Sequence, residues 1–522
     1  MAGISDHAQQ PAVEVGVGPV SFADVIAVAR HDAPVTLGAD ALQAMAASRS
    51  VIESLAADPV PHYGVSTGFG ALATRHIPTD RRAQLQRSLI RSHAAGSGPE
   101  VEREVVRAMM LLRLSTLATG RTGVRPLIAE SYAALLNAGL TPVVHEYGSL
   151  GCSGDLAPLA HCALVITGEG RVRDGAGQVG AADDLLAEHG IAPVQLTEKE
   201  GLALINGTDG MLGMLIMAIT DLRRLLTTAD LSAAMSVEGL LGTDDVFADD
   251  LAALRPHPGL AVSAGNLRRL LADSPIRESH RDPEVDTRVQ DAYSLRCTPQ
   301  VNGAARDTAD HAATVAEREL AAAIDNPVVT RDGRVESNGN FHGAPIAHVL
   351  DFLAIVTADV ASISERRTDR FLDKARNNGL PPFLADDPGV DSGHMIAQYT
   401  QAGIVSELKR LANPASVDSI PSSAMQEDHV SMGWAAARKL RRSVDGLAQV
   451  LAIELLTAAR GIELRQPLQP APSSAAVIVA LREHVAGPGP DRFLSPEIDR
   501  TVRLVQNGTL IGAAESAIGG LI

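Results

Sequence analysis

Apolar residues recur every three to four positions over long stretches of this chain, which is the spacing of a helix with one or more buried faces. The stretches become longest after residue 197, where helices are predicted at about 204–241, 300–323, 344–375 and 429–464. Helices of about 25–35 residues far exceed the usual mean of ~11–12. Such lengths suit a bundle whose helices are buried on many sides, often across subunits. The pattern therefore predicts a mainly α fold with a long central helical bundle.

The part of the chain before this bundle has shorter elements. Helical patterns are predicted at 39–56, 79–95, 99–118 and 125–137. Residues before about 35 have no such pattern, and we expect them to be loosely tethered. Asp-Gly turns between short apolar runs predict two small hairpins, at 171–179 and 328–336. A mixed N-terminal region is therefore expected in front of the bundle.

A Pro-Ala-Pro-Ser-Ser stretch at 470–474 reads as a linker that precedes terminal helices. Together these patterns predict three consecutive regions. They are a mixed region at 1–205, the long-helix bundle at 206–470 and a C-terminal helical region at 471–522. No internal repeat and no low-complexity tract occurs, so the length is not explained by duplication of one small unit.

Charge and cysteine content narrow the class of protein. The formal net charge is −17, whereas a nucleic-acid partner would need a basic face, so nucleic-acid binding is not expected. Cys152, Cys162 and Cys297 give no paired framework, which predicts a reduced, cytoplasmic protein. The first residues lack a basic stretch followed by an apolar core, so no signal peptide is expected. Charge, Gly or Pro interrupts the long apolar windows, and no membrane span is expected.

One stretch of small residues carries the candidate chemistry, Gly-Ser-Leu-Gly-Cys-Ser-Gly-Asp-Leu-Ala-Pro-Leu at 148–159. In a tight turn the Gly154 amide nitrogen can attack the Cys152 carbonyl carbon, and loss of water would close an imidazolone ring. Loss of a second water from Ser153 would leave an exocyclic methylene, a carbon electrophile that no ordinary side chain supplies. For three small residues alone, the simpler interpretation is a Gly-rich loop before the buried helix that starts near Asp155.

The longer string resembles the signature of the aromatic amino acid ammonia-lyases and aminomutases. That family builds a 4-methylidene-imidazole-5-one from Ala-Ser-Gly or a close variant, and here the triplet Cys152, Ser153 and Gly154 holds that position. Cys152 stands where Ala is commonest; the cyclisation uses only its backbone, and the ring substituent would carry a thiol. The resemblance implies a helical-bundle fold, an amino acid substrate and a homotetramer in which three subunits contribute to each active site.

Tyr63 lies in the Gly-rich stretch His-Tyr-Gly-Val-Ser-Thr-Gly-Phe-Gly at 62–70. This stretch contains Gly-x-Ser-x-Gly, the nucleophile motif of serine hydrolases, but that motif needs a strand before it and a helix after it. The residues that follow are a poor helix start, so the hydrolase reading is disfavoured. The stretch is also similar to the mobile loop of the lyase family, and the resemblance makes Tyr63 the catalytic base.

The same resemblance assigns roles to six residues further along: Asn206, Gln290, Tyr293, Arg296, Asn326 and Phe341. Arg296 would clamp the substrate carboxylate, a task that suits the planar fork of a guanidinium. Asn206 would lie beside the prosthetic group, although its place before an apolar helix also fits an N-cap. Each residue alone has an ordinary structural reading, such as a turn Asn before Pro at Asn326 or a core Phe at Phe341.

Two places bear on the choice of substrate ring. Ser92-His93 resembles the pair found in enzymes of the family that act on an imidazole, and Gln426-Glu427 supplies a carboxylate that suits a ring N–H. An imidazole-bearing amino acid is therefore the expected substrate. A tyrosine ammonia-lyase or a tyrosine 2,3-aminomutase of the same chemistry stays open, as does a catalytically silent binding protein. No zinc spacing, phosphate-binding loop or dinucleotide motif implies a metal or a nucleotide.

Overall fold

The computed structural model describes residues 11–68, 70–282, 284–286 and 288–522, and the chain groups into two compact units. Unit 1 comprises Met1–Met217, Ala313–Leu350 and Pro414–Arg438, and unit 2 comprises Ala218–Ala312, Asp351–Asn413 and Lys439–Ile522. Four of the five boundaries fall inside long helices, which are α9 (Asp209–Gly239), α14 (Thr298–Leu320), α15 (Ala344–Leu372) and α17 (Gly433–Glu463). The fifth, between Asn413 and Pro414, lies just after α16 (Met395–Leu411). The long helices were predicted to within a few residues, apart from the start of α9. The expected regions 1–205, 206–470 and 471–522 stay a prediction.

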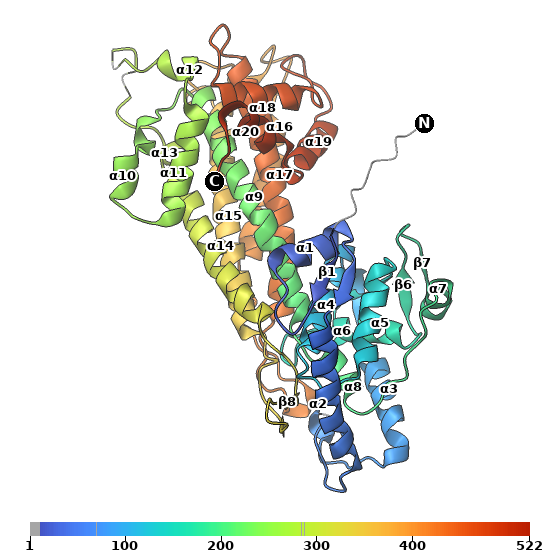
Figure 1. Ribbon diagram of the computed structural model, residues 1–522. Helices are drawn as coiled ribbons and strands as arrows, with labels where there is room; N and C mark the ends of the chain where they lie inside the picture. The colour runs from blue at the N-terminus through green and yellow to red at the C-terminus, as the bar shows by residue number, and fades with distance from the viewer. Residues whose placement is uncertain (1–10, 69, 283, 287) are drawn as a thin grey trace. The chain divides into compact units, whose positions relative to one another are not determined.

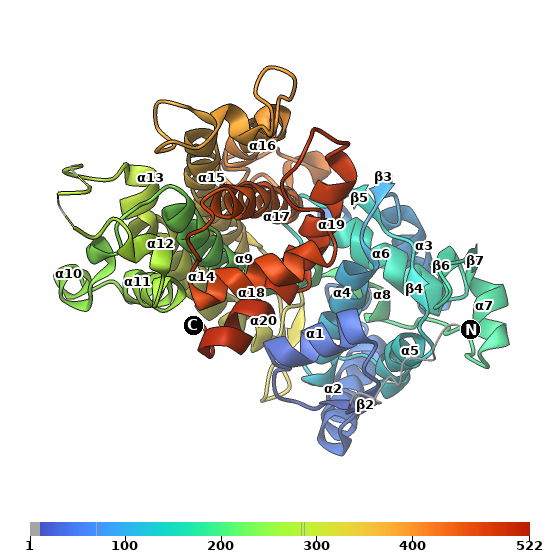
Figure 2. The same cartoon turned by 90° about the horizontal axis from the view of Figure 1, so that it is seen from above.

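Unit 1 contains a group of shorter helices, several of which pack around α4. These helices are α1 (Phe22–His31), α2 (Ala39–Ala57), α3 (Arg82–His93), α4 (Arg103–Ala118), α5 (Pro126–Asn137), α6 (Leu156–Ile166), α7 (Ala182–Glu188) and α8 (Glu200–Ile205). Every residue of α4 from Val105 onward is buried. Figure 2 shows α1, α2, α5 and α6 around it, and α4 packs against each of them. Most residues of this buried helix are apolar, and its two buried arginines, Arg107 and Arg113, donate to backbone carbonyls of other segments.

The strands of unit 1 are short and form four small sheets. They are β1 (Val13–Val15) with β2 (Val35–Leu37), β3 (Ser97–Glu100) with β5 (His145–Tyr147), β4 (Thr141–Pro142) with β6 (Arg171–Arg173) and β7 (Val179–Ala181), and β8 (Val328–Val329) with β9 (Val335–Glu336). The β1–β2 pair is parallel and the others are antiparallel. Both predicted hairpins are confirmed, as β6–β7 and β8–β9.

The expectation of a loosely tethered N-terminus is wrong for the described residues. β1 and α1 are ordered there, and Ser21 and Asp24 form a capping box at the start of α1. The Asp24 backbone N–H donates to Ser21 Oγ over 3.1 Å, and the Ser21 backbone N–H donates to the Asp24 carboxylate over 2.8 Å. The sequence signal was Ser-x-x-Asp, a variant of the usual Ser-x-x-Glu box. Residues 1–10 of that expectation lie outside the described part of the chain.

The single helix predicted at 204–241 is interrupted. α8 ends at Ile205 and α9 begins at Asp209, with a turn at Asn206, Gly207 and Thr208 between them. A β-carbon added at Gly207 would lie 2.4 Å from Arg113 Nη1. The turn is therefore pressed against a buried guanidinium, and this tertiary contact overrides the helical pattern of the sequence.

The named elements of unit 2 are all helices within its described residues. Besides its parts of the four long helices, it contains α10 (Asp249–Ala253), α11 (Pro258–Leu271), α12 (Pro275–Glu278), α13 (Tyr293–Arg296), α16 (Met395–Leu411), α18 (Pro472–Arg482), α19 (Ser495–Gln506) and α20 (Thr509–Ile518). α18 and α20 lie side by side (Figures 1 and 2). The prediction of a linker at 470–474 is wrong, because α18 begins at Pro472. Proline is favoured at the first position of a helix, since the backbone N–H that it lacks has no partner within the helix there.

A buried polar cluster connects three helices of unit 2. Arg367 on α15 makes two hydrogen bonds to the Glu454 carboxylate on α17, and both side chains are 0% exposed. Ser232 and Ser236 on α9 and Ser364 on α15 donate to the same carboxylate. Such a pair is stable in a core only when its remaining hydrogen-bonding groups are satisfied, and here the serines do this.

Two stretches, Glu200–Gly239 and Ala344–Leu372, are long and apolar enough to cross a membrane by length and composition alone. The expectation that every long apolar window is interrupted was therefore too strong. In the structure the first apolar window is completely buried and the second is 61% buried. Core helices of a folded bundle have this same composition, because they too are surrounded by apolar side chains.

Candidate functional site

A cavity of about 1010 Å³ opens within unit 1 and gathers loops that lie far apart in the sequence. Ten of the predicted site residues line it: Tyr63, His93, Cys152, Ser153, Gly154, Asn206, Asn326, Phe341, Gln426 and Glu427. They come from the loop after α2, the end of α3, the loop before α6, the end of α8 and three later loops. We call this space the site cavity.

The Cys-Ser-Gly triplet occupies a tight turn at the wall of the site cavity. Gly154 has a φ of +80°, a conformation that favours glycine, and a β-carbon added there would lie 2.2 Å from the Gly207 carbonyl oxygen. On the other side of the triplet, the Gly151 carbonyl accepts hydrogen bonds from Ser431 Oγ (2.7 Å) and from the Gly343 N–H (3.0 Å). The turn is thus held from both sides.

Asp155, which follows the triplet, ties this turn to a second helix. Its backbone N–H donates to the Gly207 carbonyl over 2.7 Å, and its carboxylate accepts from the Gly210 and Met211 N–H groups at the start of α9. The other carboxylate oxygen accepts from Ser149 Oγ over 2.9 Å. Complete burial raises the pKa of Asp155 to about 7. The prediction that Asp155 stands at a helix start is confirmed, since it is the N-cap residue of α6.

The triplet fits the prosthetic group that its sequence suggested. Ring closure needs a free Gly154 nitrogen, and within the described chain the Gly154 N–H donates to no acceptor. It also needs the backbone to fold back tightly, which the positive φ of Gly154 provides. Cys152 is 7% exposed, and burial raises the pKa of its thiol, so the sulfur stays protonated beside the turn.

Tyr63 and Glu427 line the same cavity. The Gly70 N–H approaches the Tyr63 hydroxyl oxygen at 3.5 Å. Burial raises the pKa of Tyr63, and the negative charges of Glu427 and Asp325 raise it further. Burial also raises the pKa of Glu427, whose Oε2 atom is buried and makes no hydrogen bond to any described residue. An unpaired carboxylate oxygen in a cavity is costly unless a ligand supplies a donor.

His93 ends α3 and contributes an imidazole to the site cavity. Its Nδ1 lies 2.9 Å from the Leu89 carbonyl oxygen and 3.1 Å from Ser92 Oγ. The contact with the carbonyl places a proton on Nδ1. Burial lowers the pKa of His93, so the ring is neutral near physiological pH and can accept a proton donor at Nε2.

The two asparagines are joined directly. Asn206 Nδ2 donates to the Asn326 carbonyl oxygen over 3.0 Å, and Asn326 Oδ1 accepts from the Asn338 N–H over 3.0 Å. Asn338 and His342 also line the cavity but were not predicted from the sequence. The ring of His342 stacks on that of His429, with centroids 5.7 Å apart and planes 1° from parallel. No sequence pattern indicated that Asn338 and His342 would line the cavity. Their position depends on the course of their loops in the folded chain.

Three predicted site residues lie elsewhere. Gln290, Tyr293 and Arg296 belong to unit 2, and none of them is among the described residues that line the site cavity. They form their own small cluster: Arg296 Nη2 donates to Gln290 Oε1 over 2.7 Å, and its guanidinium lies 4.6 Å from the Tyr293 ring centroid. Tyr293 is 70% exposed. The structure therefore keeps these three residues together and presents them at a surface.

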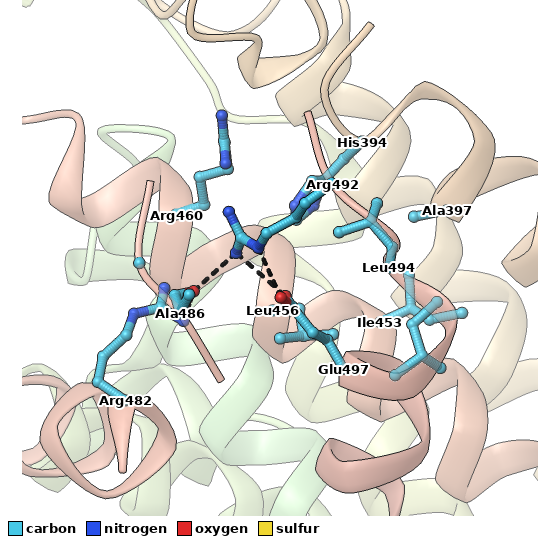
Figure 3. A pocket seen from close by; sticks show the side chains of 12 residues that line it. His394, Ala397, Ile453, Leu456, Arg460, Arg482, Ala486, Arg492, Leu494 and Glu497 are labelled. Carbon is cyan, nitrogen blue, oxygen red and sulfur yellow. Dashed lines mark hydrogen bonds and ion pairs between the residues drawn. The ribbon is translucent and has the colours of Figure 1, made fainter. Parts of the chain in front are cut away.

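Unit 2 has a much smaller cavity, of about 10 Å³, which is shown in Figure 3. Basic side chains line it, and each of three arginines already has partners. Arg492 pairs with Glu497, Arg482 pairs with Glu463, and Arg460 donates to the carbonyls of Leu384 and Gly489. A space of this size holds about one water molecule. No group of three or more His, Cys, Asp or Glu side chains suited to a metal occurs among the described residues.

Similarity to known proteins extends over nearly the whole chain. Residues 20–483 match the model of the aromatic amino acid lyase family. A histidine ammonia-lyase from Streptomyces griseus is 66% identical over 512 residues, which is 98% of this chain and 99% of that protein. A tyrosine aminomutase from Streptomyces globisporus has a TM-score of 0.92 at 35% identity and covers 98% of this chain and 100% of its own. A histidine ammonia-lyase from Trypanosoma cruzi has a TM-score of 0.88 at 35% identity. The match covers 97% of this chain and 95% of that protein.

Proposed function

Because this chain belongs to the aromatic amino acid lyase family, we propose that it eliminates ammonia from L-histidine and releases trans-urocanate. The family and the carbon–nitrogen lyase class predicted from the sequence are confirmed by the match to that family and by the similar histidine ammonia-lyases. The observation that carries the choice of substrate is Glu427. Its unpaired carboxylate oxygen lies in the cavity that also holds Ser153 and the neutral imidazole of His93.

The chemical difficulty is the removal of a substrate β-proton that is not acidic. A 4-methylidene-imidazole-5-one made from the triplet would supply an electrophilic carbon that assists departure of the amine. In our proposal Tyr63 takes the β-proton and Ser153 provides the methylene carbon. α6 begins at Leu156, directly behind the triplet, so the positive end of its dipole favours negative charge at the turn.

The remaining residues of the site cavity would orient the substrate. Glu427 would accept the imidazole N–H, and His93 would bind the other side of the ring. Asn326 would help to hold the carboxylate, Asn206 would hold the amine, and Phe341 would pack near the triplet. Gln426 would support Glu427. These roles follow the family pattern, and the placement of all six residues around one cavity supports them.

Two substitutions test the choice of ring. Glu427→Gln should reduce kcat/KM for L-histidine about ten- to hundredfold, because a charge-assisted hydrogen bond to the imidazole is lost. His93→Leu should reduce it several-fold by removing the Nε2 acceptor for the second N–H of a protonated substrate ring. Steady-state kinetics give both values, and thermal unfolding serves as the control for stability. Parental activity in both variants would remove the case for an imidazole-binding pair while leaving the lyase chemistry intact.

A tyrosine-specific enzyme of the same chemistry is the second candidate. The observation in its favour is the close structural similarity of the tyrosine aminomutase. Against it stands the sequence identity, which is 66% to the histidine ammonia-lyase of Streptomyces griseus and only 35% to this aminomutase. We further propose that the protein works in the cytoplasm, on the basis of its three unpaired cysteines.

We also propose a homotetramer in which each active site is completed by neighbouring chains. Gln290, Tyr293 and Arg296 are grouped on unit 2 and are not among the described residues that line the site cavity. In the proposed reaction a guanidinium is needed for the substrate carboxylate. A neighbouring chain that supplied Arg296 would complete the site.

Mixed tetramers test this assembly. Ser153→Ala and Arg296→Met chains should each be nearly inactive alone, whereas their co-expression should restore a minority of parental activity, since some sites would combine a healthy Ser153 with a healthy Arg296. Tyr63→Phe with Ser153→Ala is the matched control. Tyr63 and Ser153 line one cavity of one unit, so co-expression of this pair should restore no activity. Restored activity would mean that the two residues of one site come from separate chains. Light scattering that reports a monomer would contradict the assembly.

A further inference from the structure

A buried ion pair lies behind the site cavity and has no role in the chemistry above. Lys199 Nζ is 2.5 Å from Asp325 Oδ2, and both side chains are 0% exposed. Burial lowers the pKa of Lys199, and the neighbouring Asp325 charge opposes this effect. Taking two charges out of water is expensive and adds little to stability even when they are paired. The pair therefore calls for an explanation beyond packing.

The pair joins the two segments that carry the site asparagines. Lys199 immediately precedes α8, which ends at Ile205, so that Asn206 follows directly. Asp325 is adjacent to Asn326 in the chain, and its Oδ1 accepts from the Asn326 N–H over 2.8 Å. At the other end of α8, Asn206 Nδ2 donates to the Asn326 carbonyl. The same two segments are thus tied twice, once at each end of a six-residue helix.

The backbone at Lys199 indicates that its side chain is needed. Its φ is 73° and its ψ is −25°, a left-handed conformation that glycine adopts without strain and lysine does not. A glycine there would relieve the strain but would lose the tie to Asp325. Strain retained at one residue beside a functional cavity points to a role for that side chain.

Other charged groups near the pair are committed to their own partners. Arg113 on α4 donates to the Ile324 carbonyl over 2.8 Å and lies 3.4 Å from the Asp209 carboxylate. Glu319 on α14 accepts from Thr208 Oγ1 over 2.6 Å. These contacts involve the start of α9 and the residue before Asp325, and none of them uses Asp325 Oδ2, which accepts from Lys199.

We propose that Lys199 and Asp325 are positioning residues, whose ion pair holds the Asn206 and Asn326 side chains at one wall of the site cavity, where the amino acid end of the substrate binds. The inference rests on the proposed function, because that function places the substrate carboxylate near Asn326. It predicts that the pair matters for ligands that carry a carboxylate and not for the imidazole ring alone.

The test compares two inhibitors, trans-urocanate, which has a carboxylate, and imidazole, which has none. Lys199→Met should raise the KM for L-histidine and the inhibition constant of urocanate about tenfold or more, while that of imidazole changes less than about twofold. The amide of Lys199→Gln can still donate to Asp325. The KM for L-histidine and the inhibition constant of urocanate should therefore lie between those of Lys199→Met and of the parent. The loss of two waters from the triplet, measured by intact mass, should be the same in all chains.

Lys439→Met is the matched control, since Lys439 also pairs with a buried aspartate, Asp351, but within unit 2. It should leave both inhibition constants unchanged. The proposal fails if Lys199→Met keeps parental urocanate binding, if it weakens both inhibitors equally, or if neither Lys199 variant folds. A parental chain that forms no urocanate would instead refute the proposed function, so the two failures are distinguishable.

Discussion

Ser153→Ala is expected to abolish turnover of L-histidine while leaving the fold intact. The substitution removes the one hydroxyl whose loss as water would create the methylene carbon, and a missing covalent electrophile should cost about a thousandfold or more in kcat. Ser153 is only partly buried, so the lost oxygen removes little packing. Steady-state kinetics by urocanate absorbance measure the effect, and circular dichroism checks the fold.

Intact-protein mass spectrometry is the control for this variant. The parental chain should be lighter than its sequence by two waters, localised to the peptide that holds the triplet, whereas the Ser153→Ala chain should not lose the second water. Cys152→Ala should retain both losses, because ring closure uses the backbone of residue 152 and not its thiol. An active parental chain of unmodified mass would contradict the role of the triplet.

Tyr63→Phe is expected to lower kcat about 10²- to 10⁴-fold, the range for loss of a general base. The ring would stay in place, since the hydroxyl makes only a 3.5 Å contact with the Gly70 N–H. The parental mass loss of two waters should therefore be unchanged. If Tyr63→Phe retained near-parental kcat, another group would have to be the base.

The pH profile of the parental chain follows from the same residue. A tyrosine acts as a base only after it has lost its proton, and burial together with the Glu427 and Asp325 charges raises the pKa of Tyr63. The deprotonated fraction is then small at neutral pH and grows as the pH rises. kcat/KM should therefore increase toward alkaline pH, and Glu427→Gln should move that rise to lower pH by removing one negative charge. A rate that falls steadily above neutral pH would contradict this assignment.

The sequence was sufficient wherever a local pattern decides the structure. The long helices follow from sustained apolar periodicity, and the β6–β7 and β8–β9 hairpins follow from their Asp-Gly turns. The triplet was recognisable because the longer string around it, at 148–159, resembles the family signature, whereas three small residues alone also fit a Gly-rich loop. Its neighbours Tyr63, His93 and Glu427 were predicted through the family resemblance, and the fold brings them to one cavity.

What could not be predicted depends on contacts between distant segments. The break between α8 and α9 arises because Gly207 is pressed against Arg113, almost a hundred positions earlier in the chain. The Lys199–Asp325 pair looks unremarkable in the sequence, since neither residue belongs to a motif. A related limit applies to Gln290, Tyr293 and Arg296. The family resemblance assigned them roles in the site without indicating that the described cavity of one chain would lack them.

The most direct test of the central claim is identification of the product. The purified parental chain is incubated separately with L-histidine and with L-tyrosine, and the mixtures are analysed by proton NMR together with an ammonia assay. The account predicts trans-urocanate and one equivalent of ammonia from L-histidine, with little or no reaction of L-tyrosine. Coumarate or a β-amino acid from L-tyrosine, with no urocanate from L-histidine, would contradict it.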